Sequence, residues 1–225
     1  MRGRERPLDQ PVTKLSTIES PNFQGHVTRM DYLADSGIFL VRSITGLVVL
    51  LLNLRFLMQA SRADYYNPIS QGIVTATNPI IAPFRKLLPT LGRFDLANML
   101  AAILCQTVGI GLIFWISGAS LFAPVYLLWA MVGILASLLN IYFFALLIMV
   151  IASWLAPYSN HPALALVREL TEPVCEPVRR LIPAVGGLDF SIIVVFIGLS
   201  LIENTILVKP LAVILAMPRG LVVGL

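Results

Sequence analysis

Few side chains in this 225-residue chain have the types and spacing that catalysis or metal binding requires. The only two histidines, His26 and His161, lie far apart in the sequence, which argues against a metal site or a haem with two histidine ligands. Glu169, Glu172 and Glu176 form a close acidic group, but arginines surround it, so we interpret it as ion pairing on a helix surface. The sequence has no glycine-rich phosphate loop and no nucleophile beside a suitable base. We therefore expect no enzyme activity and no cofactor.

Arg42 and Glu203 are charged residues inside long apolar segments, where an unpaired charge is costly. Arg42 stands about one and a half turns into the first segment, and Glu203 about four turns into the last, which runs the opposite way. Both therefore fall at a similar depth, near the side that bears the termini. We predict a salt bridge between Arg42 and Glu203, with Asn204 beside it. The alternatives are an ion or proton site, and separate snorkelling of the two side chains toward water.

The segments that must position these residues are membrane spans. The chain is 57% hydrophobic and 12% charged, about half the charged share of a soluble domain. Helices of about 20 apolar residues cross the roughly 30 Å hydrocarbon core. We predict an all-α integral membrane protein with four transmembrane helices: Gly37–Gln59, Leu96–Ile116, Trp129–Trp154 and Phe190–Val208.

The third apolar run, 121–155, exceeds one upright crossing by roughly 10 residues. Either a short interfacial helix at Leu121–Leu128 precedes the span, or the run forms one long tilted helix. Other residues within the spans are expected to join helices. Arg55 should lie near the interface and pair with Asp64, Asp95 or Asp189. Hydrogen bonds between helices are expected from Asn98, Gln106 and Asn140, and close helix approach from Gly46, Gly109, Gly111, Gly133 and Gly198.

One nineteen-residue stretch occurs twice. Thr77–Asp95 reads TNPIIAPFRKLLPTLGRFD, and Thr171–Asp189, 94 residues later, reads TEPVCEPVRRLIPAVGGLD. Eight of the nineteen positions are identical, where roughly one would match by chance. The chain therefore contains two repeats. Because each repeat holds two spans, the repeats are parallel and both motif loops lie on one side of the membrane. The motif residues we single out are Pro79, Pro83, Arg85, Lys86, Pro89, Gly92 and Asp95, and Pro173, Pro177, Arg179, Arg180, Pro183, Gly186 and Asp189.

Each motif predicts a short amphipathic helix in the membrane interface. Thr77 or Asn78 would cap the first helix, Pro79 would start it, and the second proline would prevent a regular helix from continuing through both. The basic pair would reach toward phosphates, the glycine would allow a turn, and the aspartate would cap the following span. The motif is either a well-anchored connector or a docking surface for a partner or anionic lipid. A re-entrant pore element is disfavoured because its arginines are costly deep in the bilayer.

The chain divides into five segments by composition and repeat: a disordered extension at 1–35, a first repeat at 36–117, a connector at 118–134, a second repeat at 135–209 and a tail at 210–225. We hypothesise that the native chain starts at Met30. The net charge of +4 reflects loop residues that face the cytoplasm or touch anionic lipid, so we expect no nucleic-acid partner. The basic residues nearest the spans place the motif loops in the cytoplasm.

The repeated series of two prolines, a basic pair, Pro, Gly and Asp closely resembles the YggT family, called YlmG-like in Gram-positive bacteria, cyanobacteria and plastids. The resemblance covers about residues 36–209. It implies a bacterial inner-membrane protein with no established catalytic residue. Roles linked to the family are envelope and division-site organisation, osmotic or potassium tolerance and, in plastids, assembly of a cytochrome complex.

We expect a non-enzymatic scaffold or assembly factor whose amphipathic loops contact the lipid bilayer, anionic lipid headgroups and either a membrane-protein partner or a second copy. The alternative is a component of ion or osmolyte transport, such as potassium transport. Liposome flux measurements would separate the two.

Overall fold

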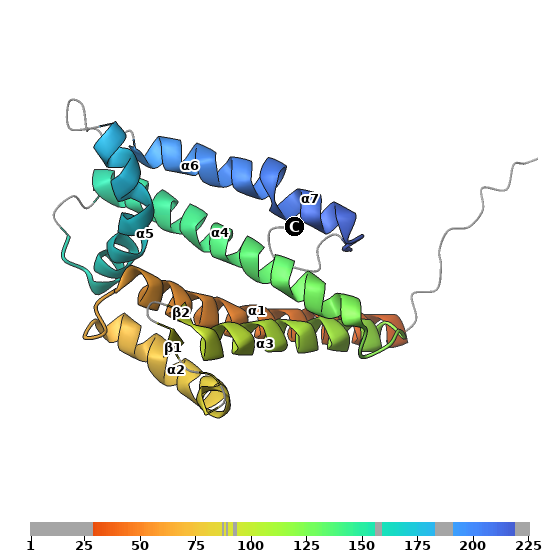
Figure 1. Cartoon of the computed structure of the whole chain (residues 1–225). Helices are drawn as coiled ribbons and strands as arrows, with labels where there is room; N and C mark the ends of the chain where they lie inside the picture. The colour runs from red at the N-terminus through yellow and green to blue at the C-terminus, as the bar shows by residue number, and fades with distance from the viewer. Residues whose placement is uncertain are drawn as a thin grey trace, which may run out of the picture.

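The computed structural model describes residues 29–86, 88, 90–91, 94–155, 159–182 and 191–218. Helices make up nearly all of the described chain, with one two-residue strand pair beside the motif (Figure 1). The elements in order are α1 Arg29–Ser61, α2 Pro68–Arg85, β1 Thr90–Leu91, β2 Phe94–Asp95, α3 Leu96–Ile116, α4 Pro124–Leu155, α5 Pro162–Leu181, α6 Ser191–Leu201, the π-helical turn η1 Ile202–Ile206, and α7 Val208–Ile214.

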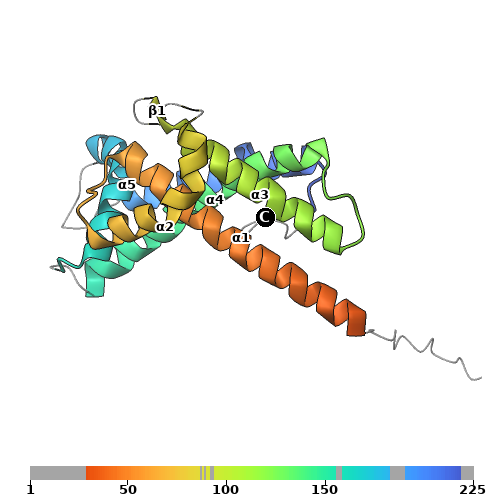
Figure 2. The ribbon, with the colours of Figure 1, turned by 90° about the horizontal axis from the view of Figure 1, so that it is seen from below.

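Within the described residues, four helical stretches are long and apolar enough to cross a membrane: Tyr32–Ser61, Leu96–Ile116, Pro124–Ser153 and Ser191–Ile214. Successive spans run in opposite directions, so α2 and α5 lie at the same end of the bundle (Figures 1 and 2). We call this end the loop side and the opposite end the terminus side. The four-span, all-helical fold is confirmed.

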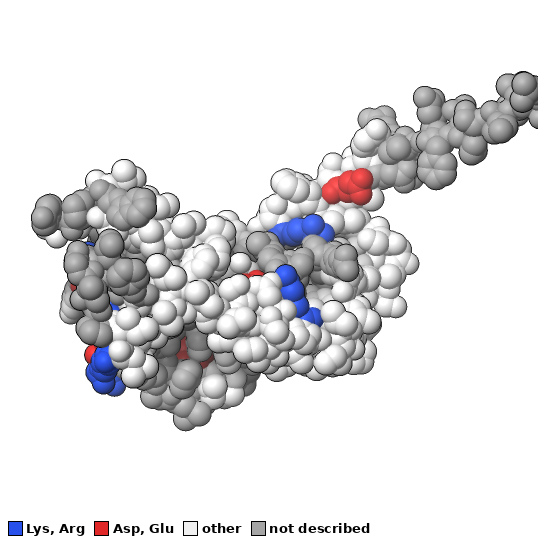
Figure 3. All heavy atoms as spheres, turned by 90° about the horizontal axis from the view of Figure 1, so that it is seen from above, with Lys and Arg blue, Asp and Glu red and all other residues white. Residues whose placement is uncertain are grey.

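The outside of the bundle is apolar. Phe39 and Ile44 on α1 are 68% and 63% exposed, which suits side chains that contact lipid tails. Figure 3 shows a mostly white face on which few Lys, Arg, Asp and Glu side chains are visible. This distribution is typical of a helical bundle that crosses a bilayer.

Two boundaries differ from the prediction. Helix α1 begins at Arg29, so residues 29–35, predicted as part of a disordered extension, are helical. Residues 1–28 lie outside the described residues. The start of the native chain at Met30 stays a hypothesis. The final helical stretch continues past Val208 to Ile214 and includes Pro210, which was placed in the tail. Proline is tolerated there because it stands in the first turn of α7, where its missing N–H has no helical partner.

Helix α4 is one long helix, the second of the two alternatives for the third apolar run. Its beginning is held by an aromatic group: the rings of Tyr126 and Trp129 lie 5.0 and 5.7 Å from that of Phe114. Trp129 also donates from Nε1 to the carbonyl of Leu215 at 3.0 Å. These contacts join the ends of α3, α4 and α7 on the terminus side.

Helices α1 and α3 pack closely because Gly109 has no side chain. A Cβ at Gly109 would lie 2.6 Å from Thr45 Oγ1. Further toward the loop side, Asn98 donates from Nδ2 to the carbonyl of Leu52 at 2.9 Å. The expected interhelical bond from Asn98 and the expected close approach at Gly109 are therefore observed. The same expectation was wrong for Gly46 and Gly198, where an added Cβ would meet nothing within 4 Å.

Candidate functional site

Helices α2 and α5 begin well before the repeated motif. Asn67 caps α2 by accepting a hydrogen bond at Oδ1 from the Ile69 amide at 2.9 Å, and His161 caps α5 through Nδ1 and the Ala163 amide at 3.2 Å. A proline follows each cap, which is a favoured helix start. The prediction that the first helix starts at Pro79 with Thr77 or Asn78 as its cap was wrong.

The first two prolines of each motif lie inside a continuous helix: Pro79 and Pro83 in α2, and Pro173 and Pro177 in α5. The prediction that the second proline would prevent a regular helix from continuing through both was therefore wrong. Polar groups reinforce the turn that precedes them. Thr77 donates from Oγ1 to the carbonyl of Ile73 at 2.7 Å, and Thr171 does the same to Val167 at 3.0 Å. Threonine back-bonding of this kind often bends a helix. The carbonyls that lose their helical donor are those of Thr75 and Pro79, four residues before each proline of α2.

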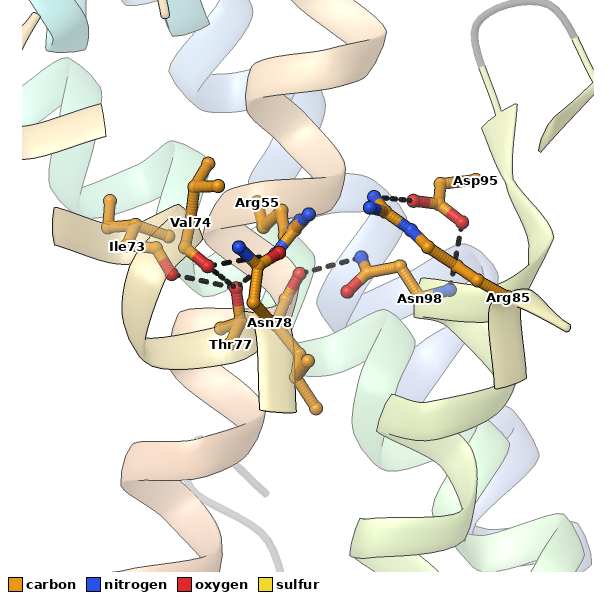
Figure 4. A network of polar contacts seen from close by, with 9 residues as sticks. Arg55, Ile73, Val74, Thr77, Asn78, Arg85, Asp95 and Asn98 are labelled. Atoms are coloured by element: carbon orange, nitrogen blue, oxygen red, sulfur yellow. Dashed lines mark hydrogen bonds and ion pairs between the residues drawn. The ribbon is translucent and has the colours of Figure 1, made fainter. Parts of the chain in front are cut away.

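Arg55 joins the first span to α2. Its side chain is 4% exposed, and Nη1 donates to Thr77 Oγ1 at 2.7 Å, to Asn78 Oδ1 at 2.9 Å and to the carbonyl of Val74 at 3.1 Å (Figure 4). Among the described residues Arg55 makes no ion pair with Asp64 or Asp95, and Asp95 pairs with Arg85 instead. Asp189, the third expected partner, lies outside the described residues. The residue at the equivalent position of the second repeat, 94 residues after Arg55, is Met149. The contact made by Arg55 therefore belongs to the first repeat alone.

Asp95 holds the end of the motif and the start of α3. One carboxylate oxygen accepts from the Asn98 amide at 3.1 Å, which caps α3 as predicted, and the other lies 3.1 Å from Arg85 Nη2. The Asp95 side chain is 1% exposed and that of Arg85 46% exposed (Figure 4). Arg85 is therefore paired with Asp95, whereas Lys86 is exposed at the helix end.

The second repeat carries its charges on the outer side of α5. Arg179 lies 2.9 Å from Glu172 and Arg180 lies 2.6 Å from Glu176. All four side chains are at least one third exposed, so each pair contributes about 0–1 kcal/mol. The interpretation of the acidic group as surface ion pairing is confirmed for Glu172 and Glu176.

Two hydrogen bonds join the repeats at the loop side. Asn67 donates from Nδ2 to the carbonyl of Pro162 at 2.8 Å, so the cap of α2 contacts the first residue of α5. Glu169 accepts from the Asp64 amide at 2.9 Å. Sequence reasoning missed both contacts, although Asn67 and His161 stand at equivalent repeat positions. We call α2 and α5, joined in this way, the loop-side platform.

The inner faces of the platform are buried at helical spacing. These faces consist of Ser70, Ile73, Thr77 and Ile81 on α2, and of Leu166, Leu170, Thr171 and Cys175 on α5. Each of the two helices therefore has one side packed on the spans and the other side outside.

Arg42 and Glu203 do not form the predicted salt bridge. In the described part of the chain neither side chain makes an ion pair, and α4 lies between α1 and the α6–η1 helix (Figure 1). Counting residues gives depth along a span, but not the order of spans around the bundle. Glu203 lies in the π-helical turn, a feature often found at functional sites.

Other predicted positions fall outside the described residues: Pro89, Gly92, Pro183, Gly186 and Asp189. Pro79, Pro83, Pro173 and Pro177 lie on the platform helices as described above. Among the described residues no group of three or more His, Cys, Asp or Glu side chains could hold a metal ion.

The arrangement of two spans around an intervening helix, present twice, coincides with a known family. The chain matches CCB3/YggT over residues 34–116 and again over 128–210. It belongs to the CCB3/YggT family. Each matched region contains two spans and one platform helix, so the family unit is the structural repeat.

Relatives of similar length occur in several bacteria. An uncharacterised protein of Pseudomonas aeruginosa is 40% identical over 191 residues, which cover 84% of this chain and 96% of the relative. A Vibrio alginolyticus protein is 41% identical over 72% of this chain and 88% of its own. YggT of Escherichia coli K12 is 33% identical over 73% and 86%. No solved structure matches the chain.

Proposed function

We propose that this CCB3/YggT protein is a non-enzymatic scaffold of the bacterial inner membrane that assembles or organises a membrane complex through its loop-side platform. The platform faces the cytoplasm in this proposal, because basic residues cluster at this end of the spans. Its partners are the anionic headgroups beside it and a membrane protein or second copy.

One observation supports this function above the others: both amphipathic helices are fixed at one end of the bundle by buried contacts and by the bond between Asn67 and Pro162. A connector needs only to span the gap between two helices, and it requires no such fixation. A recognition surface benefits from it, because a rigid surface loses less conformational entropy on binding.

The two platform helices have different outer faces, which suggests different roles. The outer face of α2 is uncharged until Arg85 and Lys86, and exposed Tyr66 stands just before the helix; tyrosine favours membrane interfaces. The outer face of α5 carries both signs of charge. We assign α2 to the lipid headgroups and α5 to a protein partner.

Site-specific photocrosslinking in native membranes tests this assignment. A photoreactive amino acid at Arg168 or Leu181 on α5 should yield adducts with another protein chain, since both side chains are exposed. The matched control is Phe39, an exposed residue on the lipid-facing side of α1, which should yield lipid adducts. If Arg168 and Leu181 give no protein adducts under conditions where Phe39 gives lipid adducts, the assignment of α5 fails.

Transport of an ion or osmolyte is a second candidate, and the intramembrane charges Arg42 and Glu203 favour it, because neither forms an ion pair in the described chain. Purified protein in liposomes that moves potassium, and stops doing so in Glu203→Gln, would support transport over scaffolding.

A further inference from the structure

A groove of about 730 Å³ lies inside the predicted membrane region, among α1, α3 and α4. Its volume is within the range of about 300–1,000 Å³ typical of small-molecule sites. Leu50, Leu54, Ile141 and Ile148 give it apolar walls, and Leu170 of α5 closes it toward the loop side. A hydrocarbon chain would suit this part of the groove.

The other part of the groove is polar. Arg42, Gln106, Ser137 and Asn140 line it. Gln106 is 7% exposed and forms no side-chain hydrogen bond with any residue that the structure describes, and its amide atoms are not fully enclosed but open to the groove. Among lipid tails, an amide without a partner costs about 1–3 kcal/mol, and a charge without a partner costs more. The groove therefore offers a cation and an amide that an occupant can satisfy.

The spacing of these groups can be counted along the paired helices. Thr45 and Gly109 lie side by side where α1 and α3 cross, and the two helices run in opposite directions. Arg42 is three residues from this level toward the terminus side, and Gln106 is three residues toward the loop side. At 1.5 Å per residue their levels differ by about 9 Å. Leu54 is about 18 Å from Arg42 by the same count, close to half the thickness of the hydrocarbon core, about 15 Å.

We propose that this groove binds one anionic phospholipid of the terminus-side leaflet. Its phosphate contacts the Arg42 guanidinium, an ester carbonyl accepts a hydrogen bond from Gln106, and one acyl chain follows Leu50 and Leu54 toward α5. By residue count, the end of α3 at Ile116 lies about 6 Å closer to the terminus-side membrane surface than Arg42 does. Because arginine side chains extend toward water, the Arg42 guanidinium can reach the headgroup level.

A phospholipid matches all three properties of the groove at once: a cation at one end, an unpartnered amide below it and an apolar channel beyond. A second copy of the chain could supply Glu203 to Arg42, but this would leave the amide and the channel to be filled by other residues. The charged residue of the site, Arg42, lies on the terminus side, and only the apolar end of the groove reaches the loop-side platform, at Leu170.

Native mass spectrometry of the full chain in detergent tests the headgroup contact. The probes are dioleoyl phosphatidylglycerol, which is anionic, and dioleoyl phosphatidylcholine, which has no net charge. Wild-type protein should retain one phosphatidylglycerol per chain in preference to phosphatidylcholine. Arg42→Gln should reduce this preference about tenfold, the loss expected for one charge-assisted hydrogen bond. Arg42→Lys keeps the charge and should keep most of the preference.

Arg62→Gln is the matched control, since Arg62 is exposed on the loop side and does not line the groove. Gln106→Leu should weaken retention of both lipids. The proposal is overturned if Arg42→Gln and Arg62→Gln reduce the preference equally, or if neither changes it. Thermal melting of each variant checks that the fold is retained.

Phosphatidylglycerol with a photoreactive group in its acyl chain, reconstituted with the protein in liposomes, tests the path of the chain. Adducts should concentrate on Leu50, Leu54 and Ile148 rather than on the exposed outer residues Phe39 and Ile44. Equal labelling of both sets would mean only general lipid contact and would overturn the proposal. Protein that crosslinks to a second copy from the groove residues would overturn it in favour of a dimer interface.

Discussion

The guanidinium of Arg55 donates a hydrogen bond to Thr77 at 2.7 Å, and this contact fixes the first platform helix to the first span. Both side chains are buried, and the same Nη1 reaches Asn78 and the carbonyl of Val74. The motif of the first repeat is therefore held from within the bundle, at the turn that its prolines would otherwise weaken.

Replacing Arg55 by Met, the residue at the equivalent position of the second repeat, should destabilise the protein. The change leaves the buried Thr77 hydroxyl oxygen and the Val74 carbonyl without their donor, at a cost of about 2–3 kcal/mol. Unfolding of the purified protein in detergent would measure it. Arg62→Met is the control, since that side chain is exposed. Equal melting of Arg55→Met and wild type would contradict the role given to Arg55.

Asp95 has two separable roles. Asp95→Ala removes the cap of α3 and the pair with Arg85, whereas Asp95→Asn keeps a capping oxygen. We expect Asp95→Ala to lose about 1–2 kcal/mol more than Asp95→Asn, the usual loss for a helix cap. Chemical unfolding of the two variants gives the difference. No difference between them would mean that the cap is unimportant.

Gly109→Ala should push α1 and α3 apart, because the new Cβ would lie 2.6 Å from Thr45 Oγ1 and 2.9 Å from Thr45 Cβ. Such overpacking costs about 1–3 kcal/mol. Adding Thr45→Gly should recover much of the lost stability in a melting experiment. Gly46→Ala is the control, since nothing lies within 4 Å of its added Cβ. A harmless Gly109→Ala would show that the helices are not so close.

The two contacts of Asn67, the cap of α2 and the bond to the Pro162 carbonyl, can also be separated by substitution. Asn67→Ser keeps a cap for α2 but cannot reach the carbonyl of Pro162 as the longer amide does, whereas Asn67→Ala loses both contacts. We expect Asn67→Ser to leave α2 helical and to increase hydrogen exchange in the first turn of α5, because the tie between the repeats is lost. Unchanged exchange at Ala163 and Leu164 would indicate that the bond does not fix the platform.

How far the sequence predicts this structure depends on whether a feature is local. The spans follow from apolar runs, and the cap at Asp95 follows from one residue before a helix. The helix starts at Pro68 and Pro162 were equally local, since Asn67 and His161 precede them, but the more prominent motif prolines directed the prediction to Pro79. The order of spans around the bundle is not local, so Arg42 and Glu203 could be assigned a depth but not a partner.

The measurement that tests the scaffold most directly is quantitative co-purification of the tagged protein from native membranes, comparing wild type, the double variant Arg179→Gln/Arg180→Gln and the control Arg62→Gln. The ion pairs of Arg179 and Arg180 are exposed, so the double variant should stay folded. A membrane-protein partner should co-purify with wild type and Arg62→Gln and should be lost from the double variant. The same proteins in unchanged ratios from all three would contradict the proposed scaffold.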